Sequence, residues 1–226
     1  MLDWIATGIE LTLFVDDRWR LIANGLAVTL IIAVAAQILG TILGGIVCFG
    51  MCSKNKIICG AANFYLALIF GMPIVVLLMI AYYIVFGGTN ISGVFVAISA
   101  FTLVAGAIVA DNIKTAYDAV DPVEIEAARG LGFSRYKAFR AVTLPQMIRL
   151  EWDSYTYGFI ELLKSTAIVG YVGTQDLTQA INIIQGNTDD AYFPIIFLAI
   201  IYLAITMTLI WLLRFLAKKM LGGFGL

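Results

Sequence analysis

The chain has 226 residues, of which 62% are hydrophobic and only 13% are charged, and its mean hydropathy is +0.96. Soluble domains carry roughly 45–50% apolar and about 25% charged residues, so this composition excludes a water-soluble fold and favours a membrane protein. The net charge of −1 excludes a nucleic-acid binder that relies on overall basicity. The absence of histidine excludes catalysis or metal binding through imidazole.

Residues 1–17 precede the first long apolar run, and we expect them to form a short amphipathic helix on the outer surface of the membrane. A cleaved signal peptide begins with basic residues, whereas this segment contains Asp3, Glu10, Asp16 and Asp17. The sequence therefore predicts a surface helix here and no cleaved leader.

Long uncharged runs follow, and a membrane helix needs about 20 apolar residues. The run 21–53 holds one span, and 57–110 holds two because the glycine-rich segment 87–93 predicts a turn in its middle. The run 191–213 holds another span. Residues 154–173 are interpreted as a span with a polar interior. If this segment lay in the membrane–water interface instead, four spans would remain. The five predicted spans are 22–49, 62–86, 92–112, 154–173 and 192–215.

The basic residues predict the orientation of these spans. Twelve of the 14 lie in the segments 54–56, 111–164 and 214–219, which fall on one side, while Arg18 and Arg20 lie on the other. Lysine and arginine concentrate on the cytoplasmic side of membrane proteins. We therefore expect the N-terminus outside and the C-terminus in the cytoplasm.

Two kinds of site are not expected in this chain. Cys48, Cys52 and Cys59 flank a predicted cytoplasmic turn, where thiols stay reduced, and no other soft ligand lies nearby to complete a metal site. No nucleotide-binding loop of the form G-x-x-x-x-G-K-[ST] occurs, so the chain is not expected to hydrolyse ATP.

The loop over residues 121–145 predicts two short helices. Asp121 is a candidate N-cap with Pro122 in the first helical position, and Gly130 and Gly132 end this helix. Ser134 is the N-cap of a second helix. That helix is expected to stop before a proline, Pro145. The two helices would form a compact knob, on which small side chains let another protein approach closely.

The same loop resembles the EAA loop of bacterial ABC importer permeases, in which a coupling helix docks into a groove of the cytoplasmic ATPase subunit. The matching positions are Glu126, Ala127, Ala128, Gly132, Leu144 and Pro145, with Val142 where isoleucine is usual. The resemblance implies that these six residues form the contact with the ATPase.

Other blocks resemble the polar amino acid permease subfamily over nearly the whole chain. They are Asn24–Leu26 with Thr29–Leu30, Gly71–Val75 with Tyr82–Tyr83, and Leu162–Ala167 with Asp176–Thr178. Four departures stand out: Phe70 and Met72 replace the usual arginine and threonine, and Tyr157–Gly158 replaces an Asn-Glu pair.

The resemblance implies an all-α integral membrane protein with five transmembrane helices, the type I ABC importer permease fold, in a single domain over residues 1–226. It also implies a permease subunit in a bacterial cell membrane that imports polar amino acids. The implied partners are a second permease chain, an ATPase dimer that binds ATP and Mg, and an extracytoplasmic solute-binding protein. No cofactor, metal or nucleic acid is expected on this chain. The alternatives are a permease for another small polar solute, or a secondary carrier or channel.

Ionisable residues at membrane depth usually face a cavity or a partner. Glu161 and Lys164 lie three residues apart on one helix face, so they either neutralise each other or line a solute pathway that would suit a zwitterion. Ser165 and Thr166 either line the same pathway or bond back into their own helix.

Three further residues are candidates for the solute pathway. Pro73 interrupts a helix and frees a backbone carbonyl, as helices beside a pathway often do. Met72 is either a constriction or simple packing. Tyr83 is either an interfacial aromatic or a hydrogen-bond partner of the solute.

Overall fold

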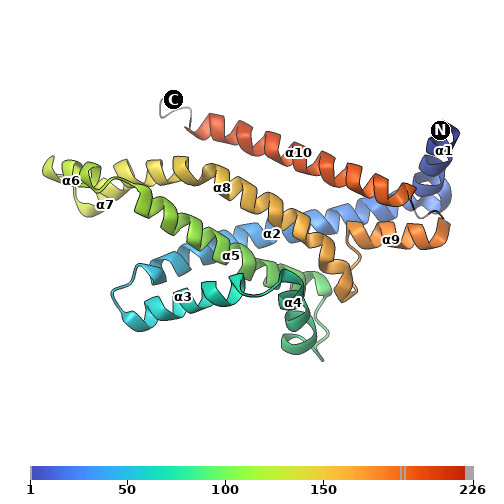
Figure 1. The fold of residues 1–226 in the computed structure, drawn as a ribbon, viewed down its shortest axis with the longest axis horizontal. Coiled ribbons are helices and arrows are strands. Elements are labelled where there is room, and N and C mark those ends of the chain that lie inside the picture. The colour runs from blue at the N-terminus through green and yellow to red at the C-terminus, as the bar shows by residue number, and fades with distance from the viewer. Residues whose placement is uncertain (1, 189, 191, 222–226) are drawn as a thin grey trace.

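The computed structural model describes residues 2–188, 190 and 192–221, and every regular element in this part of the chain is helical (Figure 1). Prediction and structure agree on the all-α class. The α-helices are α1 Leu2–Ile9, α2 Arg18–Met51, α3 Lys56–Phe70, α4 Ile74–Met79, α5 Gly93–Ala119, α6 Pro122–Gly130, α7 Arg135–Ala138, α8 Leu144–Ser165, α9 Leu177–Thr188 and α10 Phe193–Leu221. The π-helical turns are Glu10–Phe14, Ile80–Val85 and Phe139–Thr143, and the 3-10 turns are Val15–Asp17 and Thr166–Val172.

Three stretches of the described chain are long and apolar enough to cross a membrane: Ala6–Met51, Gly93–Ala119 and Phe193–Lys219. A fourth is added if α3 and the segment Ile74–Val85 form one broken span. The expected span over 154–173 is divided between α8, which begins ten residues earlier at Leu144 and carries charged residues along its length, and the 3-10 turn Thr166–Val172. The count of five spans therefore stays a prediction.

The expected span over 62–86 is not one straight helix. Two helical segments, Lys56–Phe70 and Ile74–Val85, meet at an angle of 106°. Pro73 has an extended backbone (φ −59°, ψ 137°), and its carbonyl accepts hydrogen bonds from the amides of Val76 and Leu77 at 2.9 and 3.1 Å. Because proline has no N–H to continue the first helix, the chain turns here and Pro73 starts the next one.

The sequence predicts that the helix after Ser134 stops before Pro145, but this prediction is wrong. The helical backbone runs from α7 through the π-helical turn Phe139–Thr143 into α8, with Pro145 in the first turn of α8. In the π-helical turn the amide of Leu144 donates to the carbonyl of Phe139, five residues back. This wider turn shifts the backbone hydrogen bonds just ahead of the proline. The missing N–H of Pro145 therefore leaves no backbone hydrogen bond of the helix unmade.

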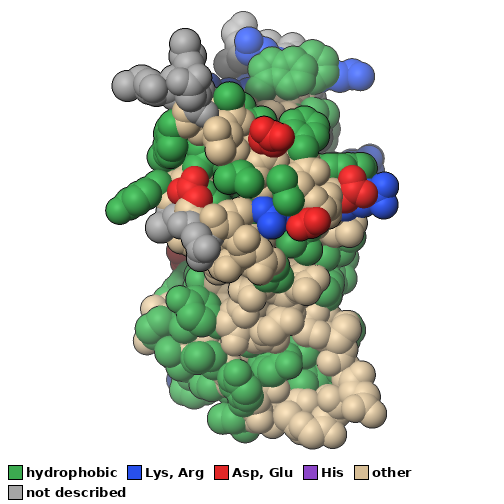
Figure 2. Space-filling model, turned by 90° about the vertical axis from the view of Figure 1, so that its right-hand side faces the viewer, with side chains coloured by type: hydrophobic (Ala, Val, Ile, Leu, Met, Phe, Trp, Pro, Cys, Tyr) green, Lys and Arg blue, Asp and Glu red, His purple; other side chains and the backbone are tan. Residues whose placement is uncertain are grey.

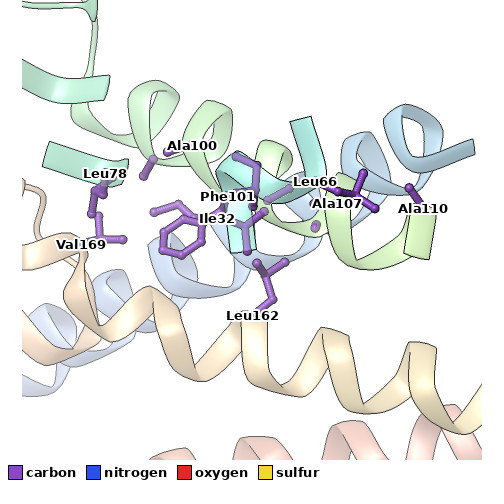
Figure 3. Close-up of a cluster of buried hydrophobic side chains, with 14 of the residues drawn as sticks. Ile32, Leu66, Leu78, Ala100, Phe101, Ala107, Ala110, Leu162 and Val169 are labelled. Atoms are coloured by element: carbon purple, nitrogen blue, oxygen red, sulfur yellow. The ribbon is translucent and has the colours of Figure 1, made fainter. Parts of the chain in front are cut away.

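The core forms around α5, which packs most closely against α2. Figure 3 shows Phe101 of α5, which is fully buried, beside Ile32 of α2 and Leu162 of α8. Two glycines of α2 allow this approach, because a Cβ at Gly40 would lie 2.4 Å from the Cβ of Ala105 and one at Gly44 would lie 2.7 Å from the Cβ of Val109. The neighbouring Gly45 has no such role, because a Cβ there would meet nothing within 4 Å.

A buried carboxylate caps α9 where this helix packs against α2. Asp176 is fully buried, and its side chain accepts hydrogen bonds from the amides of Gln179 (2.9 Å) and Thr178 (3.3 Å) at the start of α9. The hydroxyl of Thr29 in α2 accepts from the amide of Leu177 at 3.1 Å. Burial raises the pKa of Asp176 above its usual range, and the backbone hydrogen bonds only partly offset this effect.

The long helices run roughly along one axis, so the molecule has two distinct ends (Figure 1). One end carries α6, α7, the α2–α3 turn and the last turns of α10, and the other carries α1 and α9. Figure 2 looks onto the second end, where acidic and basic side chains lie in the upper part and the lower part is hydrophobic or uncharged. The predicted cytoplasmic segments thus gather at the first end.

Candidate functional site

The knob formed by α6 and α7 has the local structure that its sequence predicts. The Asp121 carboxylate accepts from the amide of Val123 at 2.9 Å, and the Ser134 hydroxyl accepts from the amide of Lys137 at 3.3 Å, so both helices have side-chain N-caps. Gly132 has a φ of +86°, which favours glycine. The amides of Gly132 and Phe133 donate to the carbonyls of Arg129 (3.0 Å) and Ala128 (3.2 Å), which closes α6 with a Schellman motif.

One face of α6 anchors the knob to the body of the protein. Ile125 packs against the cluster of Ala116, Val120 and Met147, which joins the ends of α5 and α8. Glu124 of α6 accepts a hydrogen bond from the side-chain amide of Gln146 in α8. These contacts connect α6 to two long helices, so a force on the knob is transmitted to α5 and α8.

The opposite face of the knob is exposed and partly apolar. Glu126 and Ala127 lie on this face, and Val123, Leu131 and Tyr136 expose 66%, 81% and 69% of their surface. Apolar side chains that cluster on a surface outside the membrane usually mark a site where another protein binds. The exposed face of the knob is therefore a candidate docking surface.

The six residues predicted to contact an ATPase occupy three different environments. Glu126, Ala127 and Gly132 are exposed on the knob, whereas Ala128 is buried and packs inside the chain. Leu144 and Pro145 lie at the junction with α8, where Leu144 is partly exposed. Of the two alanines, only Ala127 offers its small side chain to a partner.

A polar groove with a volume of about 530 Å³ lies between α5 and α8. The side-chain amide nitrogen of Asn112 is buried there and has no hydrogen-bond partner among the residues that the structure describes. An unpaired buried donor is costly, so it points to a polar group that enters the groove. The lining residues are Ile108 and Asn112 of α5 with Asp153, Ser154, Tyr157, Gly158 and Glu161 of α8.

Glu161 and Lys164 are ion-paired, as their spacing predicts. Their side chains are 40% and 48% exposed, so the pair is not sealed inside the protein, and Glu161 also lines the groove. The structure therefore contains the local ion pair and places the Glu161 carboxylate at the edge of the groove, while a role of the pair in a solute pathway stays a prediction.

The other candidate pathway residues lie elsewhere. The Thr166 hydroxyl is buried and donates to the carbonyl of Leu163 at 2.6 Å, which is the bond back into its own helix, and Ser165 beside it is half-buried. Met72 and Pro73 form the break before α4. Tyr83 lines a separate hollow of about 290 Å³ beside the turn 86–89.

The pathway residues proposed from the sequence do not include four polar residues that line the groove: Asn112, Asp153, Ser154 and Tyr157. The signal was present, because Ser154, Tyr157 and Glu161 follow each other at intervals of three and four residues, which places them on one helix face. The predicted span 154–173 begins at the first residue of this stripe and leaves Asp153 outside, and Asn112 lies at the predicted edge of the preceding span.

Comparison with known proteins shows which family of membrane proteins this chain resembles. Residues 40–222 match the family described as "Binding-protein-dependent transport system inner membrane component". A putative glutamine transport system permease protein, GlnP, of Rickettsia typhi is 30% identical over 202 residues, covering 88% of this chain and 93% of the relative. The histidine/lysine/arginine/ornithine transport system permease protein HisQ of Escherichia coli is 28% identical over 210 residues, covering 88% of this chain and 92% of HisQ.

Solved structures show the same similarity. An amino acid ABC transporter crystallised with histidines superposes with a TM-score of 0.80 at 34% identity, covering 88% of this chain and 94% of that one. An inward-facing MetNI methionine ABC transporter superposes with a TM-score of 0.68 at 22% identity, covering 92% and 98% of the two chains. The second comparison supports the fold alone.

Proposed function

The chain belongs to the family of inner membrane components of binding-protein-dependent transport systems, and from this premise we propose that it is the permease subunit of an ATP-driven ABC importer for polar amino acids. As a permease component it is not itself an enzyme. The amino acid class comes from the relatives, whose names specify glutamine or the group histidine, lysine, arginine and ornithine. The similarity covers 88% of this chain, which is the observation that carries the proposal.

We propose that the knob couples ATP hydrolysis to movement of the spans. A cytoplasmic ATPase dimer, which binds ATP and Mg, would cover the exposed face with Glu126, Ala127 and Leu131. When the ATPases close, the knob moves with them, and the contacts of Ile125 and Glu124 carry this motion into α5 and α8. The coupling needs no bond chemistry from this chain.

We propose that the α5–α8 groove forms part of the solute pathway. It presents the carboxylates of Asp153 and Glu161, the amide of Asn112 and hydroxyls of Ser154 and Tyr157, and the Lys164 ammonium group lies beside it. Both signs of charge are therefore within reach of a zwitterionic amino acid. A second permease chain, identical or homologous, would complete the pathway.

The proposed orientation places the knob, the α2–α3 turn and the end of α10 in the cytoplasm of a bacterial cell. These segments lie at one end of the molecule and carry most of its basic residues, which agrees with the cytoplasmic bias of lysine and arginine. The other end, with α9 and the turn 86–89, would receive the solute-binding protein.

Substitution of Gly132 tests the coupling role. The Gly132→Trp variant should insert into the membrane but lose uptake and uncouple ATP hydrolysis, because it adds a bulky ring on the docking face at a left-handed position. Gly132→Asn should keep most of the uptake, since asparagine tolerates this conformation. Gly60→Trp, at a glycine of α3 with equally open space, is the control and should transport normally. Normal uptake by Gly132→Trp would contradict the coupling assignment.

A further inference from the structure

A second groove, with a volume of about 480 Å³, lies between α2, α8 and α10 and is entirely different in character. Its walls are hydrocarbon, for example Leu30 and Val34 of α2, Phe159 of α8 and Leu212 of α10. Among the described lining residues Thr208 alone carries a polar side chain, and its hydroxyl donates to the carbonyl of Ala204 at 2.7 Å within the same helix. The groove therefore offers nothing to a polar ligand and suits a hydrocarbon chain.

The groove is bounded at the α9 end. There Ile22, Leu177, Ile181 and Ile184 form a buried cluster that also packs against residues of α10, among them Ile201. From this closed end the groove runs along α10 from Ile200 to Leu212, a distance of about 18 Å at 1.5 Å per residue. That is close to the thickness of one leaflet, about half of the roughly 30 Å hydrocarbon core.

A basic group lies beyond the other end of the groove. Lys219 follows Leu212 by seven residues, or about two helical turns, so it continues the same face of α10 roughly 10 Å further on. Lys218 lies beside it, and both lysines are exposed. Arg214 follows Leu212 by only two residues and thus points to a different side of the helix.

We propose that this groove binds an acyl chain of an anionic glycerophospholipid, with the phosphate of the lipid paired to Lys219. The hydrocarbon walls fit the acyl chain, and the ammonium group complements the phosphate at the depth where the leaflet's headgroups lie. A second copy of the chain fits less well, because a parallel α10 in this groove would bring the lysine pairs of the two copies together. The inference uses the proposed function only for the placement in a membrane.

Native mass spectrometry of the full-length chain in detergent, titrated with phosphatidylglycerol or phosphatidylcholine, tests this site. Lys219→Gln should weaken phosphatidylglycerol binding about five-fold, the effect of one basic residue at a membrane surface, and leave phosphatidylcholine unaffected. Arg214→Gln is the matched control and should change neither. Because Lys219 is exposed, its replacement leaves the fold intact.

A second pair of variants tests the hydrocarbon part of the site. Ala204→Phe fills the groove and should abolish the retained lipid, whereas Leu203→Phe, on the exposed face of the same helix, should not. Retention of lipid by Ala204→Phe, or an equal effect of Lys219→Gln and Arg214→Gln, would overturn the proposal. Loss of a chain-to-chain complex in Ala204→Phe would also overturn it, because the groove would then be an interface between copies. None of these readouts depends on transport, so they leave the permease assignment untouched.

Discussion

Leu131 offers the most direct test of how the knob docks. Its side chain is 81% exposed at the end of α6, so Leu131→Asp removes almost no packing from the free permease. If the ATPase buries this side chain, the variant loses a burial free energy of about 2 kcal/mol. That loss raises the dissociation constant of the complex roughly 30-fold. The cost of burying a carboxylate raises it further.

The assay is binding of the purified ATPase subunit to the permease in nanodiscs, with the thermal unfolding temperature of the permease measured in parallel. Ile57→Asp is the control, because Ile57 is also 81% exposed and lies in the first turn of α3, at the same end but outside the knob. We expect weaker binding only for Leu131→Asp and an unchanged unfolding temperature. An unchanged dissociation constant would refute the docking surface.

Three other substitutions test the core, the groove and the buried cap. Gly44→Val should lower the free energy of unfolding by about 1–3 kcal/mol, because its Cβ would lie 2.7 Å from the Cβ of Val109. The control Gly45→Val should leave the free energy of unfolding unchanged, since a Cβ there meets nothing within 4 Å. Equal unfolding temperatures of the two variants in detergent would contradict the α2–α5 packing. Glu161→Gln should raise the KM for uptake with little change in stability, while Asp118→Asn, which breaks the comparable Lys114 pair outside the groove, should leave KM unchanged. Asp176 has a raised pKa in the folded chain, so the folded state binds more protons than the unfolded state, and stability should fall as the pH rises above the ordinary pKa of aspartate. Asp176→Asn should remove this decline, and an identical pH profile of unfolding temperature in the variant would rule out the titration of Asp176.

Local chemistry made the knob predictable from the sequence. Each end of these short helices depends only on residues within about one turn of it. The structure contains the predicted caps at Asp121 and Ser134, and the helix end at Gly132, which has a left-handed backbone. The course of the chain at prolines was less predictable. Pro73 turns the chain by 106°, whereas Pro145 is absorbed by a π-helical turn, because the hydrogen bonds of the preceding turn decide the outcome.

The polar groove and the buried cap depend on contacts between distant segments. Asn112 and Ser154 are 42 positions apart in the sequence and line the same hollow only because α5 packs on α8. Asp176 is buried because Gly25 lets the chain approach α2 closely: a Cβ at Gly25 would lie 2.7 Å from the carbonyl oxygen of Asp176. Hydrophobic periodicity carries no signal for either contact.

ATP hydrolysis in proteoliposomes is the measurement that tests the central claim most directly. The chain would be reconstituted with a candidate ATPase and a candidate solute-binding protein from the same organism, and a panel of amino acids would be added one at a time. The account predicts that one or a few polar amino acids, with the binding protein present, stimulate hydrolysis and are transported inward. Failure of the chain to assemble with the ATPase, or uptake that proceeds without ATP, would contradict it and favour a secondary carrier or channel.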